Sequence, residues 1–320
     1  MKKKLLSMRF MLTMLALLFC TSNLMANDNV LRFRYYPSNH TAGLIGNSYI
    51  GDVVIPETVI IKGEQYTVTS VESQAFDKCS RVTSITLPVS IKSFYASLSD
   101  CIFLDRININ SIESFLDMNI NSDVQFFQNG VTELYLNGKI VENVVFTNKA
   151  PHHTLAGYKK LKNVTFNNPE STQIWDSTLA GCTNIDTLRF LSPKLICGER
   201  TSMNCKDIYI YGDIITHNCP IFINADFFYF AGSSAELHSK SEINVKTCLI
   251  DNNSFWTSSS SVLYFNNKTT IVVSPKIKKA YYMDGYQEKS YIYSTDKVIF
   301  LNPSIKLPKG VNYNTSYYVI

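Results

Sequence analysis

Four sulfur- and nitrogen-bearing side chains lie within a short stretch of the chain and could hold a transition metal. They are Cys197, Cys205, His217 and Cys219. Thiolate and imidazole ligands suit Zn²⁺, but structural zinc sites use closely spaced pairs such as C-x-x-C, and the sequence contains none. Irregular spacing is more typical of cysteines packed as small apolar side chains in a core. The sequence therefore predicts no metal site.

Two further groups could take part in acid–base or metal chemistry. His152 and His153 are adjacent, so on an extended chain their side chains point apart and suit a surface loop better than one metal. Asp176 and Glu199 could form a glycosidase pair, but nothing in the sequence brings them together. The sequence also lacks a nucleophile elbow, a phosphate-binding glycine loop, an H-E-x-x-H motif and a dinucleotide fingerprint. We therefore expect no catalytic residues, no cofactor and no enzymatic activity.

The elements that position side chains in this chain follow from an internal repeat. Four copies share a Cys or Tyr followed by apolar residues three, six and eight places later. These copies are Cys79, Val82, Ile85, Leu87; Cys101, Leu104, Ile107, Ile109; Tyr158, Leu161, Val164, Phe166; and Cys182, Ile185, Leu188, Phe190. The final apolar pair then recurs downstream as Ile208/Ile210, Phe228/Phe230 and Cys248/Ile250, so that Phe190, Ile210, Phe230 and Ile250 follow one another at a constant step. Such self-similarity indicates a repeat architecture.

The repeat has a simple physical interpretation. An apolar-x-apolar pair is a short strand with two side chains pointing inward and the middle one outward. A strand of this length cannot bury its apolar face alone, but stacked copies share one core and pair edge to edge at about 4.8 Å. Cys79, Cys101 and Cys182 recur at one repeat position, where a small apolar side chain fits a tight corner. The sequence predicts a mostly β solenoid with short parallel strands.

The first repeats resemble a known family. Gly51 to Pro56 (GDVVIP), Gly63 to Val71 (GEQYTVTSV), Ala75 to Cys79 (AFDKC) and Val82 to Pro88 (VTSITLP) are similar to the opening of BspA-like leucine-rich-repeat proteins, the type-5 leucine-rich repeats of Bacteroides-type bacteria. The match covers residues 49–109. The resemblance implies a right-handed leucine-rich-repeat solenoid, export, and a role in adhesion to host proteins or glycans. It transfers no catalytic residues, because the family motif is structural.

The resemblance also indicates the domain organisation, with one stretch left open. Leu134 to Lys139 (LYLNGK) resembles the hairpin that introduces a further repeat block, and Asn137-Gly138 is itself a strong hairpin signal. Between residues 110 and 150 either Val124/Phe126 or Leu134/Leu136 could supply the strand. We predict an N-terminal β cap at 27–66, with a turn at Lys62-Gly63, the solenoid at 67–274 and a C-terminal cap at 275–320. Repeats after 190 lose the Ala-Phe and Pro of the family pattern.

Residues 1–26 have the features of an export signal. Lys2, Lys3, Lys4 and Arg9 precede an apolar run from Phe10 to Cys20, which is too short to span a bilayer, and Ala26 offers a small residue for cleavage. A lipid anchor at Cys20 is the alternative, although Phe19 stands where a lipobox has a small residue. No other run is long enough for a transmembrane helix. We expect an extracellular or cell-surface location, with the periplasm as a further option.

The charge of the chain narrows the range of expected partners. The formal net charge of +4 includes the four cations of the signal, and no block of Lys or Arg remains afterwards. Nucleic acid and anionic membranes are therefore not expected as partners.

Seven cysteines follow the signal, an odd number that leaves at least one thiol unpaired and the pairing of the others open.

A different set of residues is predicted to face solvent from successive strands. These residues are Arg189, Tyr209, Tyr211, Phe227, Tyr229 and Tyr264. An exposed row of aromatic side chains marks a binding surface for a host or matrix protein or a glycan. The alternative is that Tyr and Phe simply suit strands and support one another across the ladder. A structural spacer, or an accessory component of a surface glycan-handling system, is then the second functional hypothesis.

Overall fold

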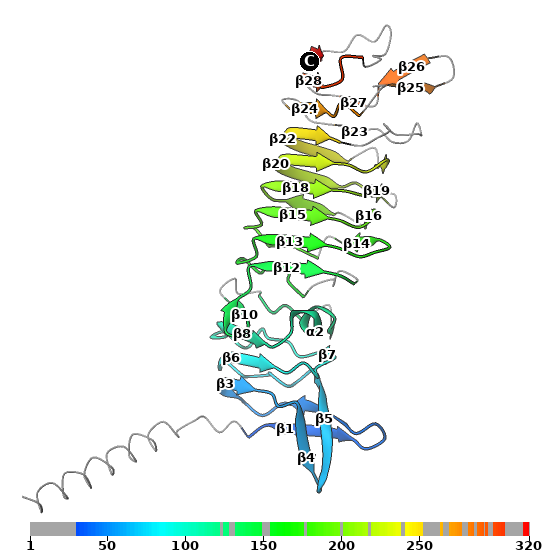
Figure 1. Ribbon diagram of the computed structural model, residues 1–320. Helices are drawn as coiled ribbons and strands as arrows, with labels where there is room; N and C mark the ends of the chain where they lie inside the picture. Colours follow the sequence, from blue (N-terminus) through cyan, green and yellow to red (C-terminus); the bar gives the residue numbers. More distant parts are fainter. Residues whose placement is uncertain are drawn as a thin grey trace, which may run out of the picture.

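The computed structural model describes most of the chain from Val30 onward. The described residues are 30–121, 124–127, 132–148, 154–175, 178–198, 201–216, 219–237, 241–251, 263–264, 269–276, 281–284, 287–290, 292–293, 297–304 and 316–319. Almost all regular structure among them is β, and the chain winds upward as a stack of coils (Figure 1). The predicted signal at 1–26, including the alternative anchor residue Cys20, lies outside the described residues.

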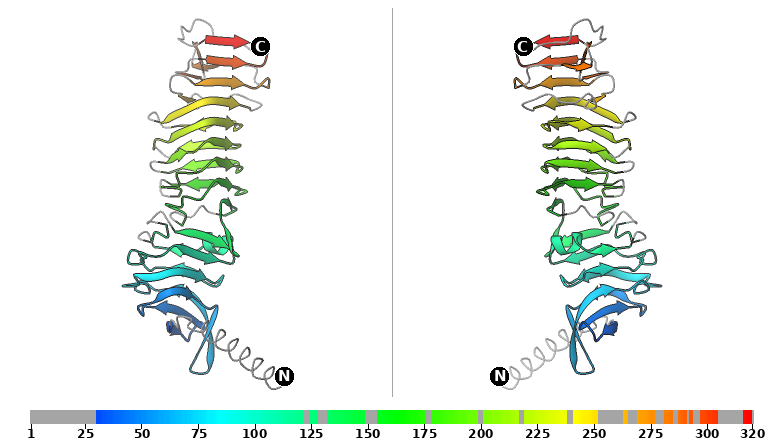
Figure 2. Two further views of the ribbon diagram at one scale, coloured as in Figure 1. Left: turned by 90° about the vertical axis from the view of Figure 1, so that its left-hand side faces the viewer. Right: turned by 90° about the vertical axis from the view of Figure 1, so that its right-hand side faces the viewer.

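The longest sheet runs through the second half of the molecule. It follows the path β12-β13-β15-β18-β20-β22-β24-β28-β29, and β17 also pairs with β20. The strands are β12 (Asn143–Phe146), β13 (Asn163–Phe166), β15 (Thr187–Phe190), β17 (Ser202–Asn204), β18 (Asp207–Ile210), β20 (Phe222–Phe230), β22 (Glu242–Ile250), β24 (Thr270–Val273), β28 (Lys297–Phe300) and β29 (Ser316–Val319). Every pair is parallel, and both side views show the strands running rung upon rung (Figure 2).

The register of this main sheet confirms the repeat. Phe190 pairs with Ile210, Ile210 with Phe230, and Phe230 with Ile250. Each constant step in the sequence is therefore one coil, and equivalent side chains form one column. The predicted solenoid of short parallel strands is confirmed.

A smaller sheet forms another wall of the same coils. It has the order β14-β16-β19-β21, with β14 (Thr172–Ile174), β16 (Lys194–Cys197), β19 (Asp213–Thr216) and β21 (Ala235–Glu236). Its buried side chains, among them Ile174, Leu195 and Ile214, pack on the same core as the main sheet. Each of these coils thus contributes one strand to each wall, which explains why neither sheet is exposed on its inner face.

The first half of the molecule has two sheets of its own. One follows β11-β10-β8-β6-β3 and the other β1-β2-β5-β7-β9, with β4 also on β5. Their strands are β1 (Arg32–Tyr36), β2 (Thr41–Ile45), β3 (Ile50–Val54), β4 (Thr58–Ile61), β5 (Glu64–Val71), β6 (Arg81–Leu87), β7 (Ser93–Phe94), β8 (Arg106–Ile109), β9 (Asn119–Ile120), β10 (Glu133–Leu136) and β11 (Lys139–Ile140). Antiparallel pairing is confined here to β1/β2, β4/β5 and β10/β11, and the other neighbours are parallel.

Both predicted tight turns are present. Lys62 and Gly63 join β4 to β5, and Asn137 and Gly138 join β10 to β11. All four residues have positive φ, which the two-residue hairpin turn requires. The second hairpin separates the two stacks, because β10 pairs with β8 and β11 and does not pair with β12.

The structure settles the open register before this hairpin. Leu134 pairs with Ile107 and is fully buried, so Glu133–Leu136 supplies the strand. Val124 and Phe126 are buried but lie outside any strand. A short helix, α2 (Ile112–Leu116), fills part of the interval, and the Ser111 side chain caps it by accepting a hydrogen bond from the Ser114 N–H. The repeat pattern of the sequence does not predict this helix.

The repeat residues form one continuous core. All of those named at the repeat positions are buried: Cys79, Val82, Ile85, Leu87, Cys101, Ile107, Ile109, Leu161, Val164, Phe166, Cys182, Ile185, Leu188, Phe190, Ile208, Ile210, Phe228, Phe230, Cys248 and Ile250. They belong to a single hydrophobic cluster that extends past the break between β10 and β12. Tyr158 helps to bridge that break, because its buried hydroxyl donates a 2.7 Å hydrogen bond to the carbonyl of Val141 beside the hairpin.

The two ends contain the segments for which caps were expected. Residues 27–66 hold β1 to β4 and the start of β5. Beyond residue 274, β25 (Tyr281–Asp284) pairs with β26 (Gln287–Ser290), and β27 (Ile292–Tyr293) pairs with β23 (Leu263–Tyr264). β28 and β29 continue the parallel main sheet as two further rungs. The described part of the segment predicted as a C-terminal cap therefore contains two strands that extend the main sheet and three that belong to separate two-stranded sheets.

Candidate functional site

The outward face of the main sheet brings five of the predicted binding residues together. Leu188 and Phe190 of β15 point into the core, so the alternation of the strand turns Arg189 outward. The same alternation acts in β18 and β20, and Arg189, Tyr209 and Tyr229 are paired in register on successive rungs. We call Arg189, Tyr209, Tyr211, Phe227 and Tyr229 the aromatic strip.

The members of the aromatic strip contact one another across the rungs. The Arg189 guanidinium lies 5.3 Å from the centroid of the Tyr209 ring. The Tyr209 ring lies 5.7 Å from that of Phe227 and 6.0 Å from that of Tyr229, and the Tyr211 and Tyr229 rings are 5.2 Å apart. Tyr211 is 45% exposed, and the other four are partly exposed. The strip is thus one cluster of tilted rings with a cation at one end.

An acidic group and a second cation lie at the other end of the strip. The Tyr229 hydroxyl donates a 3.0 Å hydrogen bond to Asp251 Oδ2, and Lys276 Nζ is 2.9 Å from Asp251 Oδ1. Lys276, then Ser274 and Tyr229, hold the pKa of Asp251 below its ordinary value against the effect of burial. Burial, and then the hydrogen bond to Asp251, raises the pKa of Tyr229 to about 12. Tyr229 is therefore a neutral, oriented phenol at physiological pH.

Sequence reasoning missed Asp251 and Lys276, although one signal was available. Tyr211, Ala231 and Asp251 follow one another at the same constant step as the core column, and the backbone N–H of each bonds to the last core residue of the preceding rung. Asp251 thus occupies the repeat position of Tyr211, two coils further on. Lys276 follows a longer step, from Ile250 to Val273, which the constant pattern does not reach.

Tyr264 does not join the strip. It lies on β23, which pairs with β27 in a separate two-stranded sheet. The expectation that it continues the row is corrected, because Tyr229 is followed in register by Leu249 and then by Val272. Both are partly exposed aliphatic residues, so the outward column remains apolar beyond the aromatic rings.

This arrangement suits recognition of a partner. The strip combines aromatic faces with an arginine at one end and an ion pair at the other, and its five residues include neither a free nucleophile nor a carboxylate pair poised for acid–base work. Aromatic and arginine side chains dominate the energetics of protein interfaces because they bury large areas at low entropic cost. The aromatic faces and the guanidinium of the strip are therefore placed to contact a partner.

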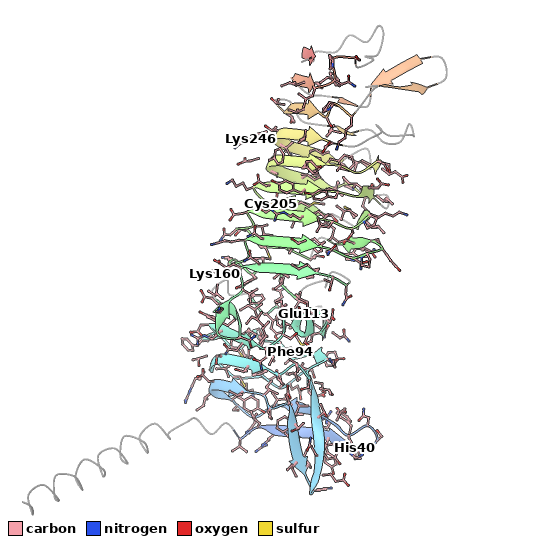
Figure 3. All side chains as sticks on the ribbon, viewed as in Figure 1. His40, Phe94, Glu113, Lys160, Cys205 and Lys246 are labelled. Atoms are coloured by element: carbon pink, nitrogen blue, oxygen red, sulfur yellow. The ribbon has the colours of Figure 1, made fainter. Side chains whose placement is uncertain are left out.

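The cysteines considered as metal ligands are placed for packing. Cys197 is fully buried in β16, and Cys205, labelled in Figure 3, is half-buried beside the start of β18. Burial raises the pKa of each thiol to about 12, which opposes the thiolate form that metals bind. Cys219 is half-buried and His217 lies outside the described residues. Within the described part of the chain, no three His, Cys, Asp or Glu side chains group as a metal site.

The remaining chemical candidates lie outside the described residues. These are His152, His153, Asp176 and Glu199. The structure therefore does not test the metal-binding and acid–base roles considered for them.

Across the ranges that the structure describes, no helix is long and apolar enough to cross a membrane.

All seven cysteines that follow the predicted signal are free thiols, which gives a direct chemical prediction. Cys197 and Cys248 are fully buried, and burial raises both pKa values. We expect alkylation of these two thiols at pH 8 to be slower by on the order of a thousandfold in the native protein than in urea, because the thiolate is the nucleophile. Mass spectrometry after timed iodoacetamide labelling measures each site.

The same labelling experiment tests the pairing itself. In urea without reductant, Cys79, Cys101, Cys182, Cys197, Cys205, Cys219 and Cys248 should all become labelled. A pair that labels only after addition of a reductant would contradict the structure.

Comparisons with known proteins give two structural neighbours. No family model matches the chain, and no curated protein matches it. One neighbour is a leucine-rich repeat protein from Bacteroides ovatus, with 15% identity, 90% of this chain and 89% of the other covered, and a TM-score of 0.29. The other is a leucine-rich cell surface protein from Faecalibacterium prausnitzii, with 12% identity, coverage of 79% and 89%, and a TM-score of 0.25. The parallel ladders of the chain itself establish its solenoid fold.

Proposed function

We propose that this chain is an exported, non-catalytic binding module of the cell surface or the surrounding medium. It holds a host or matrix protein, or a glycan, on the aromatic strip. The observation that carries the proposal is the contact of Arg189, Tyr209, Phe227, Tyr229 and Tyr211 on three successive rungs of one rigid sheet. The four cations and the apolar run that open the sequence support export.

The side chains of the strip are preorganised for binding by contacts within the protein. Tyr229 is held by Asp251, which is held in turn by Lys276, and Tyr209 lies under the guanidinium of Arg189. Side chains that are already ordered lose little entropy on association, so more of the contact energy appears as affinity. Strand pairing on both sides keeps the spacing of the rings fixed.

The proposal is tested with a ligand screen followed by substitutions in the strip. The mature chain is screened against glycan and matrix-protein arrays, and the dissociation constant of the strongest ligand is then measured. Tyr211→Ala should weaken binding about tenfold, and the double variant Tyr209→Ala/Tyr229→Ala about a hundredfold, because buried aromatic anchors contribute roughly 1–2 kcal/mol each.

A matched control exists on the other stack of coils. Tyr135 on β10 also faces outward, and Arg106 lies 4.9 Å from the centroid of its ring. Tyr135→Ala removes the same kind of Arg–Tyr contact away from the strip and should leave the affinity unchanged. Equal affinity in the double strip variant would refute the proposal, because the ligand would then bind at another surface of the chain.

A further inference from the structure

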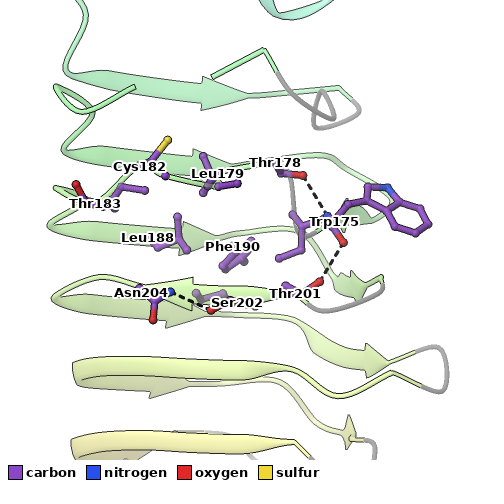
Figure 4. Close-up of a pocket in the computed structure, with 15 residues that line it drawn as sticks. Trp175, Thr178, Leu179, Cys182, Thr183, Leu188, Phe190, Thr201, Ser202 and Asn204 are labelled. Carbon is purple, nitrogen blue, oxygen red and sulfur yellow. Dashed lines mark hydrogen bonds between the residues drawn. The ribbon is translucent and has the colours of Figure 1, made fainter. Parts of the chain in front are cut away.

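A cavity of about 280 Å³ opens between two consecutive coils in the middle of the molecule. Its floor is the inward side of β15, formed by Leu188 and Phe190 (Figure 4). One wall is the turn that runs from Thr178 to Ile185 in the coil above, and the other is β17 in the coil below. The cavity therefore lies on the opposite face of β15 from Arg189 and the aromatic strip.

The cavity arises because the two coils differ in length. The step from Phe166 to Phe190 is longer than the step from Phe190 to Ile210. The extra residues of the longer coil bond upward to the preceding coil: the Cys182 thiol donates to the Leu155 carbonyl at 3.1 Å, and Asn184 Nδ2 donates to the Lys159 carbonyl at 2.9 Å. The turn is thus drawn away from the coil below it.

Both ends of the opening are closed by direct hydrogen bonds between the coils. The Lys206 N–H donates to the Ile185 carbonyl at 3.3 Å, and Thr201 Oγ1 donates to the Ile174 carbonyl at 3.4 Å. About five residues of extended chain separate the two hydrogen-bonded residues of the lower coil, Thr201 and Lys206, so the opening between them is roughly 15 Å long. A continuous peptide strand cannot pass through, so the opening admits a compact molecule.

The lining is apolar at depth and polar but uncharged at the rim. Leu188 and Phe190 at the floor and Met203 on the β17 wall are buried, whereas the side chains of Thr183 and Ser202 are exposed at the edge. Among the described residues that form the wall, none is Lys, Arg, Asp or Glu. A charged ligand would lose its hydration here without gaining a partner from this wall, so the chemistry selects a neutral one.

Backbone groups of β17 complete the site. The Phe222 N–H bonds to the Thr201 carbonyl, and the Cys205 N–H bonds to the Asn224 carbonyl, so odd-numbered residues of this segment face β20. Backbone groups alternate along a strand, and those of Ser202 and Asn204 therefore face the cavity. Among the described strands only β20 pairs with β17, which leaves this edge as a source of donors and acceptors.

We propose that this cavity is a binding site for a compact, neutral, mainly apolar ligand with a fused or single aromatic ring and one polar group. An apolar cavity of about 150 Å³ holds benzene, so this volume accommodates roughly two fused rings. The ring fills the space above Leu188 and Phe190, and the polar group bonds to the strand edge at Ser202 and Asn204. An unfilled space would leave those side chains without contacts on one side.

The test uses 2-naphthol, a neutral bicyclic phenol, with naphthalene-2-sulfonate as the anionic counterpart. Titration calorimetry on the mature chain should show 1:1 binding of 2-naphthol, with at least tenfold weaker binding of the sulfonate. Met203→Phe fills the cavity from the β17 wall and Leu179→Trp fills it from the opposite wall; each should weaken 2-naphthol binding at least tenfold. Met203→Leu keeps the volume and should bind as the wild-type protein does.

The outcomes separate this site from the aromatic strip. Tyr211→Ala should not change 2-naphthol binding, because Tyr211 packs against Tyr229 on the outward face of the main sheet and does not line the cavity. Absence of 2-naphthol binding at millimolar concentration, or unchanged binding in both folded filling variants, would overturn the proposal. Neither result would affect the function proposed for the strip.

Discussion

Replacing Phe166 with alanine is expected to lower the free energy of unfolding by about 3–5 kcal/mol. Phe166 has no exposed surface, and its ring stacks between those of Phe146 at 4.8 Å and Phe190 at 4.9 Å. The cavity left by the ring cannot collapse, because strand pairing to β12 and β15 fixes the backbone on both sides. The full cost of the lost contacts should therefore be observed.

Urea unfolding followed by circular dichroism measures this loss. Val145→Ala on the adjacent strand is the control, because Val145 points outward and is 51% exposed. That variant should change the free energy of unfolding by less than about 0.5 kcal/mol. A loss below about 1 kcal/mol in Phe166→Ala would show that the phenylalanine column does not hold the coils together.

The column that makes Phe166 so important was visible in the sequence because its chemistry is periodic. An inward residue must be apolar in every coil, so Phe190, Ile210, Phe230 and Ile250 recur at a fixed step and the solenoid follows from them. Hairpins were equally readable, since Asn137-Gly138 needs only its own backbone preference to turn the chain.

Features that depend on coil length were not predictable in the same way. A fixed step leads from Tyr229 to Leu249 and then to Thr269, but the coil after Ile250 is longer and puts Val272 in that column instead, while Tyr264 lies in a separate sheet. The repeat pattern does not show where one coil contains extra residues that take no part in the main sheet. The cavity beside Phe190 has the same origin, because a longer coil lies over a shorter one.

The candidate site was therefore predicted only in part. Arg189, Tyr209, Tyr211, Phe227 and Tyr229 lie where strand alternation puts them. Asp251 and Lys276 depend on how the coils stack, and their ion pair orients Tyr229 in a way that no spacing rule contains. Alternation thus predicts which residues face outward, and coil stacking decides which of them touch.

Stacking also imposes a close approach of backbones at the corner between β18 and β19. Gly212 occupies this corner, and a Cβ atom built on it would overlap the carbonyl oxygen of Ser192 and the backbone of Pro193 in the coil above. Gly232 stands at the equivalent corner one coil later, where a Cβ atom would overlap the backbone of Gly212. The atoms in the way are backbone atoms held by the ladders, so they cannot move aside independently.

Gly212→Ala is therefore expected to lower the free energy of unfolding by about 3 kcal/mol, toward the upper end for an overpacked core site. Gly198→Ala is the matched control: the nearest atoms to a Cβ there belong to the ring of Trp175, a partly exposed side chain, and not to backbone held by the ladders. Its loss should stay below about 1 kcal/mol. Urea unfolding of both variants makes the comparison. The two coils are joined at this corner by backbone hydrogen bonds, such as the 2.9 Å bond from the Asp213 N–H to the Pro193 carbonyl. If Gly212→Ala proved as stable as Gly198→Ala, the coils would have to move apart here despite these bonds, and the close approach would not be a fixed feature of the fold.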